Sequence, residues 1–262
     1  MPMLDRTGMQ IHWREDGDPS GTPVVFANSL GTDLTLWDAV LPLLPDRLRL
    51  IRFDLRGHGR SGVPPAPYTL DDLVGDAEAL LDHLGVRGAV FVGLSLGGLI
   101  AQGLAARRPD QVAALVLSNT AAKMGSAEMW RDRIAKIEAG GIASIADPIL
   151  DRWFGPAFRA SAAVAPWRAM LVGTPQEGYV GCCQALAGAD LTRSTAGLRL
   201  PALAIGGSAD GASPSEIVRA TAALIPGAKF VEIEDAGHLP CVEAPDAHAA
   251  ILRQFIEEVT DA

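Results

Sequence analysis

The chain has 262 residues and a formal net charge of −9, with 48% hydrophobic and 20% charged residues. This length and composition indicate one large folded domain with a substantial core and exclude a disordered chain. Because there is no basic surplus, neither nucleic acid nor an anionic membrane is expected as a partner, although a small anionic ligand needs only one or two well-placed cations.

Strand and helix patterns alternate along the first part of the chain. An edge hairpin is expected around 9–14, and buried strands are expected over 23–27, 48–53, 88–92 and 112–117. Helices are expected over 37–44, 71–84 and 99–107. Polar, glycine-containing loops follow two of the strands, at 28–33 and 54–62. Strands that alternate with helices imply a parallel sheet with right-handed crossovers.

This alternation stops between residues 121 and 198, where the pattern is helical and no strand is convincing. The segment contains three tryptophans, Trp130, Trp153 and Trp167. After it, strands over 202–205 and 229–233 alternate with helices over 215–224 and 244–259. We interpret residues 121–198 as a helical cap inserted into an α/β core of residues 1–120 and 199–262, with a mostly parallel central sheet flanked by helices.

The stretch around Ser95 has the spacing of a nucleophile elbow, Gly93-x-Ser95-x-Gly97, between an apolar strand and a helix. A serine on so sharp a turn has strained backbone dihedrals, and glycines two residues to either side remove the Cβ atoms that would clash there. The turn exposes the Ser95 hydroxyl beside a helix N-terminus, whose N–H groups stabilise developing negative charge. Ser95 is therefore the candidate nucleophile.

A serine nucleophile needs a base, and the base needs a carboxylate that orients it. Asp210 follows a predicted strand, and His238 follows the last one. The chain order Ser95, Asp210, His238 is that of the α/β-hydrolase fold, and all three residues fall at carboxyl ends of parallel strands. Two alternatives remain: Asp235 is the acid in place of Asp210, or the aspartate and the histidine only belong to turns.

The N–H of Leu96 and the N–H of Leu30 are predicted to form the oxyanion hole. Many α/β hydrolases have His-Gly at the point where this chain has Asn28-Ser29, but the role belongs to the backbone and survives the change. Ser29, in the same loop, is assigned to the substrate-binding side of the site.

The remaining histidines carry no clear chemistry. His58 is interpreted as structural and placed near the site by its loop, while His12, His83 and His248 are expected on solvated faces. No cluster of His, Asp or Glu suggests a metal, and the elbow lacks the glycine and lysine pattern of a phosphate loop.

Three cysteines, Cys182, Cys183 and Cys241, lack metal-ligand spacing, and the adjacent pair is poorly placed for an ordinary disulfide. Reduced thiols are therefore expected. The first residues do not read as a signal peptide, and no apolar run is long enough to span a bilayer. The expected location is the cytoplasm.

Several segments resemble the 3-oxoadipate enol-lactonases. They are 28–33 (NSLGTD), 56–59 (RGHG), 93–98 (GLSLGG), 118–122 (SNTAA), 152–154 (RWF) and 177–182 (EGYVGC). The elbow and the triad mark only the α/β-hydrolase superfamily, whereas the loop at 28–33 and the cap segments are more specific. The resemblance implies opening of the enol-lactone of 3-oxoadipate, in the bacterial degradation of aromatic acids through the β-ketoadipate pathway, with no cofactor.

Two other activities fit the same residues, since a carboxylesterase and a cofactor-free haloperoxidase-like enzyme would use the same serine chemistry. A third alternative is a non-catalytic relative that acts as a binding module, and the intact Ser95, Asp210 and His238 count against it. Only the resemblance selects the small, anionic lactone as the partner. The oligomeric state does not follow from the sequence.

One feature supports an anionic substrate independently of the resemblance. In the helix expected from about 126 to 138, Trp130, Ile134 and Ile137 share one face, and Arg133 falls within that apolar stripe. A cation on an inward face needs a partner. Arg133 is therefore assigned to the substrate carboxylate, with Trp130 and Trp153 as walls of the binding site. Alternatively, Arg133 pairs with a structural acid or extends to the rim, the tryptophans are cap core, and another cation binds the carboxylate: Arg152, Lys136 or Arg168.

Overall fold

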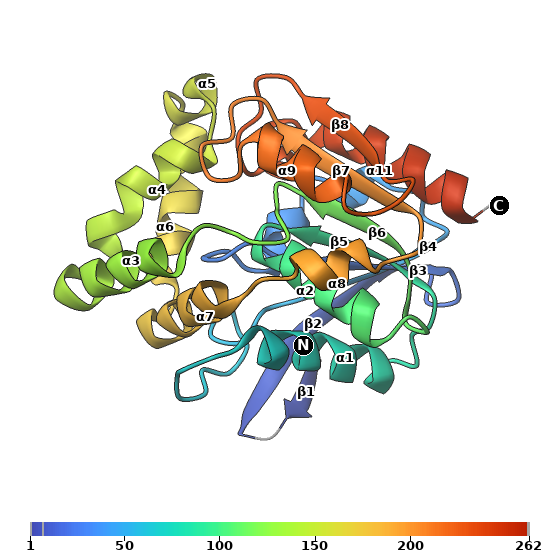
Figure 1. Ribbon diagram of the computed structural model, residues 1–262, viewed down its shortest axis with the longest axis horizontal. Helices are drawn as coiled ribbons and strands as arrows, with labels where there is room; N and C mark the ends of the chain where they lie inside the picture. Colours follow the sequence, from blue (N-terminus) through green and yellow to red (C-terminus); the bar gives the residue numbers. More distant parts are fainter. Residues whose placement is uncertain (1, 7, 261–262) are drawn as a thin grey trace.

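The computed structural model describes residues 2–6 and 8–260, which are built around one central sheet. In these residues the sheet has eight strands in the order β1-β2-β4-β3-β5-β6-β7-β8 (Figure 1). The strands are β1 (Met3–Arg6), β2 (Met9–Gly17), β3 (Thr22–Ala27), β4 (Leu48–Phe53), β5 (Ala89–Leu94), β6 (Val112–Ser118), β7 (Ala202–Gly207) and β8 (Lys229–Ile233). β1 and β4 each pair antiparallel with β2, and the pairs from β4 across to β8 are parallel, which confirms the predicted mostly parallel sheet.

Helices cover the sheet, so its central strands can be apolar throughout. Every residue of β5 is buried, as expected for a strand with both faces covered. α1 (Leu70–His83) packs against α2 (Leu96–Arg107), while α2 and α9 (Ser215–Ala222) lie against the strands. α11 (Pro245–Thr260) lies on the far side of the strands from α1 in Figure 1, next to α10 (Pro240–Glu243).

The parallel strands all end at the same edge of the sheet. The loops that follow β3, β4, β5, β6, β7 and β8 therefore meet there. These loops contain Asn28, Ser95, Asp210 and His238, so the fold brings together residues up to 210 positions apart, from Asn28 to His238 (238 − 28).

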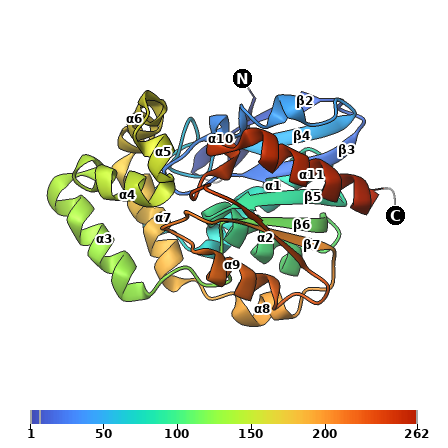
Figure 2. The same ribbon diagram turned by 90° about the horizontal axis from the view of Figure 1, so that it is seen from above.

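In the described part of the chain, the segment between β6 and β7 contains helices and no strand. Its elements are α3 (Ala127–Gly140), η3 (Ile142–Ile145), α4 (Ala146–Trp153), α5 (Pro156–Arg159), η4 (Ala162–Val164), α6 (Ala165–Gly173), α7 (Gln176–Gly188) and α8 (Thr192–Ala196). α3, α4, α6 and α7 extend beyond the end of the sheet, on the left of Figures 1 and 2, whereas α8 packs on α2. The boundaries of a separate cap at 121 and 198 stay a prediction.

The helix predicted over 37–44 does not form. The structure has two short 3-10 segments instead, η1 (Leu34–Trp37) and η2 (Leu41–Leu43). Pro42 and Pro45 explain the difference, because proline donates no backbone hydrogen bond and disfavours a helical residue before it. In the first of these segments Leu34, Leu36 and Trp37 are buried.

The expectation that His12 and His248 are solvated is wrong, whereas His83 is exposed as predicted. His12 is 3% exposed, and its Nδ1 lies 2.7 Å from Oδ2 of Asp54. His248 is fully buried, with Nε2 3.3 Å from Oγ of Ser118. A buried polar group needs a partner, and both partners come from distant segments that a local pattern does not reveal.

The cysteines and the helix lengths agree with the sequence analysis. Cys182, Cys183 and Cys241 are buried free thiols. Among the described residues, no helix has both the length and the apolar character needed to cross a bilayer.

Candidate active site

Ser95 lies at the sharp turn between β5 and α2, with φ 56° and ψ −114°. Such a positive φ is strained for any residue except glycine. A Cβ atom on Gly93 would stand 2.3 Å from the carbonyl oxygen of Gly97, and one on Gly97 would stand 2.2 Å from that of Ala27. The glycine spacing recognised in the sequence therefore has a steric cause. Ser95 is 5% exposed and lines an internal cavity, so its hydroxyl faces a pocket and not the open surface.

Asp210 and His238 are in direct contact. Oδ2 of Asp210 lies 2.9 Å from Nδ1 of His238 and also accepts a hydrogen bond from Nδ2 of Asn119 at 2.9 Å. Its Oδ1 accepts from the backbone N–H groups of Ala212 and Ser213. Burial by itself would raise the pKa of Asp210, but His238 and these hydrogen bonds outweigh it and lower the pKa, so the carboxyl is an anion near neutral pH.

The carboxylate fixes the orientation of the imidazole. Since Asp210 accepts at Nδ1, this nitrogen carries a proton, and Nε2 of neutral His238 is left to accept one. The backbone N–H of His238 donates to the carbonyl of Trp153 at 2.7 Å. Ser95 and His238 line the same cavity, and no hydrogen bond joins these two described residues. Serine and base often come into hydrogen-bonding distance only once substrate is bound.

Asp235, the alternative acid, does not contact His238 in the described structure. It is exposed, and its backbone N–H donates to Oγ of Ser208 at 2.8 Å. The imidazole contact belongs to Asp210 alone among these two carboxylates.

Asn119 is a site residue that the sequence analysis missed. It follows β6 directly, with a positive φ of 48°, and is fully buried. Its Nδ2 donates to Asp210 and to the carbonyl of Gly237, while its Oδ1 accepts from Oγ of Ser118. Asn119 could have been predicted as a site residue from its position, because a polar residue directly after a buried parallel strand falls at the edge of the sheet where Ser95 lies.

Two backbone N–H groups near Ser95 lack a hydrogen-bond partner in the part of the chain that the structure describes. They belong to Leu96, the first residue of α2, and to Leu30, which lines the cavity together with Ser29. Asn28 anchors this loop, since its Nδ2 donates to the carbonyl of Phe53 and its carbonyl accepts from the N–H of Gly97. Two such donors, one at a helix N-terminus and one in the loop after β3, can stabilise an oxyanion.

The cavity over Ser95 is formed mainly by the helices between β6 and β7. It has a volume of about 70 Å³ and is partly open to solvent. Its apolar lining includes Met129, Trp130, Ile149, Trp153 and Leu186. Trp130 and Trp153 are both 5% exposed and belong to the main apolar core, so the two alternative descriptions, core and wall, both hold. Trp167 lies elsewhere, against Phe154.

Two arginines line the cavity without an acidic partner among the described residues. The Arg133 guanidinium lies 4.7 Å from the ring centre of Trp130. Nε of Arg152 donates to the carbonyl of Gly211 at 2.8 Å, and burial together with the charge of Arg133 lowers the pKa of Arg152. The pairing of Arg133 with a structural acid, one of the alternatives from the sequence, is therefore not seen.

The other two cations proposed for the carboxylate lie outside this cavity. Arg168 forms an ion pair with Asp147 at 2.8 Å, and Lys136 lines an adjoining, more open hollow. Tyr179, which lies in the enol-lactonase-like segment 177–182 but was assigned no role from the sequence, does line the cavity. Its hydroxyl is buried beside Arg133, and burial raises the pKa of Tyr179 while the Arg133 charge opposes that rise. The arrangement suits an anion, which would accept from both groups.

The described residues contain no group of three or more His, Cys, Asp or Glu side chains that could hold a metal ion. What the arrangement offers chemically is a serine, an imidazole backed by a carboxylate, and two free N–H donors beside a cationic cavity.

Comparison with known proteins places the chain in a family. Residues 24–251 match the model described as "Alpha/beta hydrolase family". The chain belongs to this family. The α/β-hydrolase fold predicted from the sequence is thus confirmed, and the protein is a hydrolase.

Within the family, the chain is similar to enol-lactonases. It is 36% identical to 3-oxoadipate enol-lactonase 2 of Acinetobacter baylyi, over 96% of each chain. It is 32% identical to 3-oxoadipate enol-lactonase 1 of the same organism, over 98% of this chain and 97% of the other. The crystal structure of the enol-lactonase from Burkholderia xenovorans superposes with a TM-score of 0.93, at 39% identity, over 97% of this chain and 99% of that one. The resemblance found in the sequence is confirmed.

Proposed function

We propose that this α/β hydrolase opens the enol-lactone of 3-oxoadipate to 3-oxoadipate, in the cytoplasmic degradation of aromatic acids through the β-ketoadipate pathway. One observation carries the proposal: Ser95 and His238 share a cavity with Arg133 and Arg152, which have no acidic partner among the described residues. The similarity to named enol-lactonases over nearly the whole chain supports it.

The first half of the reaction forms an acyl-enzyme. Oγ of Ser95 attacks the lactone carbonyl while Nε2 of His238 takes the hydroxyl proton. The N–H groups of Leu30 and Leu96 stabilise the negative charge that develops on the carbonyl oxygen. The ring C–O bond then breaks, and the enol oxygen leaves as an enolate, which is a better leaving group than an alkoxide and needs little help from an acid. The enolate then takes the proton that His238 holds, which gives the enol and restores the imidazole as a base for the next step.

The second half releases the product. His238 removes a proton from water, the water oxygen attacks the acyl carbonyl, and the bond to Oγ of Ser95 breaks as the serine regains its proton. The enol tautomerises to the ketone, giving 3-oxoadipate. Asp210 stays ionised throughout and stabilises the imidazolium that forms twice in the cycle.

The substrate carries a carboxylate remote from the lactone carbonyl. Arg133 is proposed to bind it, since a guanidinium holds a carboxylate with two parallel hydrogen bonds and this one stacks on Trp130 at the cavity wall. Arg152 and the buried Tyr179 hydroxyl line the same space and can add to this contact. Trp153 and Ser29 form further parts of the wall.

The direct test is a spectrophotometric assay that follows loss of the enol-lactone chromophore, with the lactone generated in situ from muconolactone. A panel of simple aryl and alkyl esters is run beside it. The proposal requires the enol-lactone to have the higher kcat/KM. An enzyme that prefers the esters is a carboxylesterase, and one that turns over neither and fails to react with a fluorophosphonate is a binding relative.

A further inference from the structure

His58 lies in the loop after β4 and is completely buried. β4 pairs in parallel with β3, so this loop and the loop that contains Leu30 leave the sheet side by side. The sequence suggested that His58 is a structural histidine near the site. The contacts of the His58 ring indicate a more specific structural role.

Both ring nitrogens of His58 have a partner. Nδ1 lies 3.1 Å from the carbonyl oxygen of Arg56, and Nε2 lies 3.0 Å from the backbone nitrogen of Gly31. A carbonyl can only accept, so Nδ1 carries the proton, and a backbone N–H can only donate, so Nε2 is the acceptor. The two contacts thus select a single neutral tautomer. Burial lowers the pKa of His58, which keeps the ring neutral near pH 7.

The group that His58 holds is next to an oxyanion donor. Gly31 follows Leu30, whose N–H is the second donor proposed above. Gly31 has φ +80°, and a Cβ atom there would stand 2.7 Å from the side chain of Leu171 and 3.0 Å from that of Tyr179. The turn is therefore tight and leaves little room for adjustment, so a hydrogen bond to the Gly31 N–H fixes the direction of the adjacent peptide.

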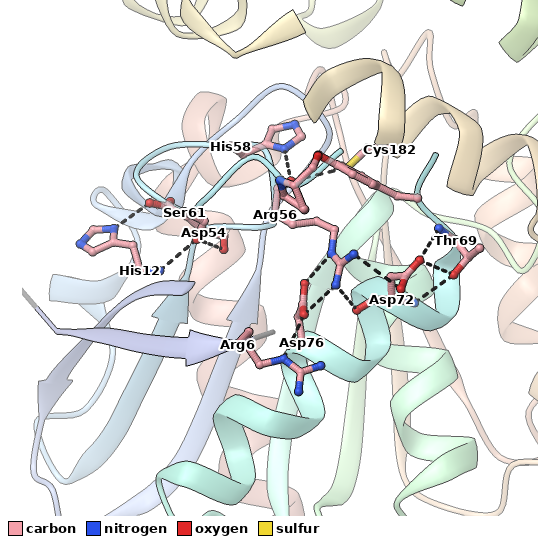
Figure 3. Close-up of polar contacts among 12 residues, drawn as sticks. Arg6, His12, Asp54, Arg56, His58, Ser61, Thr69, Asp72, Asp76 and Cys182 are labelled. Atoms are coloured by element: carbon pink, nitrogen blue, oxygen red, sulfur yellow. Dashed lines mark hydrogen bonds and ion pairs between the residues drawn. The ribbon is translucent and has the colours of Figure 1, made fainter. Parts of the chain in front are cut away.

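Arg56, whose carbonyl contacts the His58 ring, is itself hydrogen-bonded to helix α1 (Figure 3). The guanidinium of Arg56 donates to both oxygens of Asp76, from Nε at 2.7 Å and from Nη2 at 2.8 Å. Asp76 is buried in α1, and the carbonyl of Asp72 accepts a further hydrogen bond from Arg56. The Arg56 carbonyl that orients the His58 ring therefore has a fixed place relative to helix α1.

We infer that His58 is a positioning residue of the oxyanion hole, which holds the Leu30–Gly31 turn through Nε2 so that the Leu30 N–H points into the cavity. The inference rests on the proposed function, because it takes Leu30 as an oxyanion donor. It assigns to His58 no contact with substrate.

Two substitutions separate the two ring nitrogens. In His58→Gln, the side-chain carbonyl reaches the place of Nε2 and can accept from Gly31. In His58→Asn, the amide reaches only the place of Nδ1, so it can donate to the Arg56 carbonyl but leaves the Gly31 N–H unpaired. Both variants lose the ring, and they differ from each other by one methylene and by which ring nitrogen the amide replaces.

His58→Asn is expected to lower kcat about 10- to 100-fold, less than the loss of a whole oxyanion donor, with KM within about threefold of wild type. His58→Gln is expected to retain most of kcat. The difference should appear on the enol-lactone and on 4-nitrophenyl acetate alike, since both substrates form an oxyanion. Equal kcat values in the two variants, or a loss confined to KM, would overturn the inference.

Thermal unfolding identifies the fraction of each variant that is folded. If neither variant folds, the test is made on the wild-type protein labelled with ¹⁵N-histidine. Long-range ¹H–¹⁵N spectra should then show His58 as the Nδ1–H tautomer. An Nε2–H tautomer would overturn the inference. Failure of the proposed function is a separate result, because it appears as wild-type enzyme that does not open the enol-lactone. The comparison of the variants on 4-nitrophenyl acetate is unaffected by that result.

Discussion

At the scale of single residues, the site depends on which polar atoms are already satisfied. Both oxygens of Asp210 accept two hydrogen bonds each, so the carboxylate cannot turn away from His238. By contrast, the Arg133 guanidinium has no acidic partner among the described residues, and the buried Tyr179 hydroxyl lies beside it at the wall of the cavity. The hydrogen bonds to Asp210 keep His238 in one orientation, whereas Arg133 and Tyr179 face the cavity in which a substrate would bind.

Ser95→Ala should abolish turnover and leave the fold intact, because it removes one hydroxyl that makes no hydrogen bond to the described residues. Loss of one member of a triad lowers kcat by several orders of magnitude. The assay is steady-state turnover of the enol-lactone beside a thermal unfolding curve. A variant with more than a few per cent of wild-type activity would show that Ser95 is not the nucleophile.

Asp210→Asn should lower kcat by about 10³- to 10⁴-fold, since an amide disturbs the tautomer and the charge support of His238. KM should change much less. Asp235→Asn is the matched control, because Asp235 is an exposed aspartate in the loop just before His238. Steady-state kinetics of both variants give the ranking, and a larger loss in Asp235→Asn would transfer the acid role to that residue.

Arg133→Met should lower kcat/KM on the enol-lactone about 10- to 100-fold, equivalent to roughly 1.5–3 kcal/mol for a charge-assisted hydrogen bond. The methionine keeps most of the apolar stem against Trp130. Activity on an uncharged aryl acetate should change little.

Arg131→Met controls for this change, because Arg131 is on the same helix and exposed. Equal losses on both substrates in Arg133→Met would mean damaged packing. No loss on the enol-lactone would move the carboxylate contact to Arg152.

At the scale of elements, hydrogen bonds at the N-terminus of α1 fix where this helix begins. α1 begins with a capping box, in which Oγ1 of Thr69 accepts from the N–H of Asp72 at 3.1 Å and the Asp72 carboxylate accepts from the N–H of Thr69 at 2.8 Å. The same helix contains Asp76, which holds Arg56 and through it the loop of His58. The N-terminal capping of α1 therefore helps to hold the loop of His58, which lies beside the cavity.

Thr69→Ala should lower the free energy of unfolding by about 1 kcal/mol, the usual effect of removing an N-cap hydroxyl. Thr69→Ser keeps the hydroxyl and serves as the control. Urea denaturation of the three proteins gives the comparison. If the alanine and serine variants are equally stable, the capping box does not contribute to stability.

At the scale of the whole molecule, the core contains titratable groups that stay neutral. His248 is fully buried, and burial lowers its pKa to about 4. In the unfolded chain its pKa is near 6.5, so between these values the unfolded state binds a proton that the folded state does not. Stability contributed by neutral His248 is therefore complete above about pH 6.5 and is lost as the pH falls toward 4.

The free energy of unfolding should accordingly fall on acidification over this window, with His248 contributing roughly 2–4 kcal/mol. His248→Gln should flatten the slope between pH 6.5 and 4, and His83→Gln, an exposed histidine, should leave it unchanged. Denaturant unfolding at a series of pH values measures these slopes. Identical slopes in wild type and His248→Gln would refute the assignment.

Much of the fold follows from short-range patterns. Continuous apolar runs predict strands such as β5, because a strand covered on both faces has no polar side, and helical spacing predicts α1 and α2. The exception, η1 and η2, shows the limit of spacing alone: Pro42 and Pro45 prevent the hydrogen bonds that a helix would need.

The alternation of strands and helices and the elbow at Ser95 could be predicted from residue types at fixed local spacing, and the chain order singled out Asp210 and His238. The folded structure was needed to show which carboxylate contacts His238 and that Asn119 supports that carboxylate. It was also needed to show that His12 and His248 are buried, and that Arg152 and Tyr179 line one cavity with Arg133. The physical reason is that hydrogen-bond partners and burial come from segments that meet only when the sheet and the helices pack. Local periodicity does not show which distant segments will be in contact.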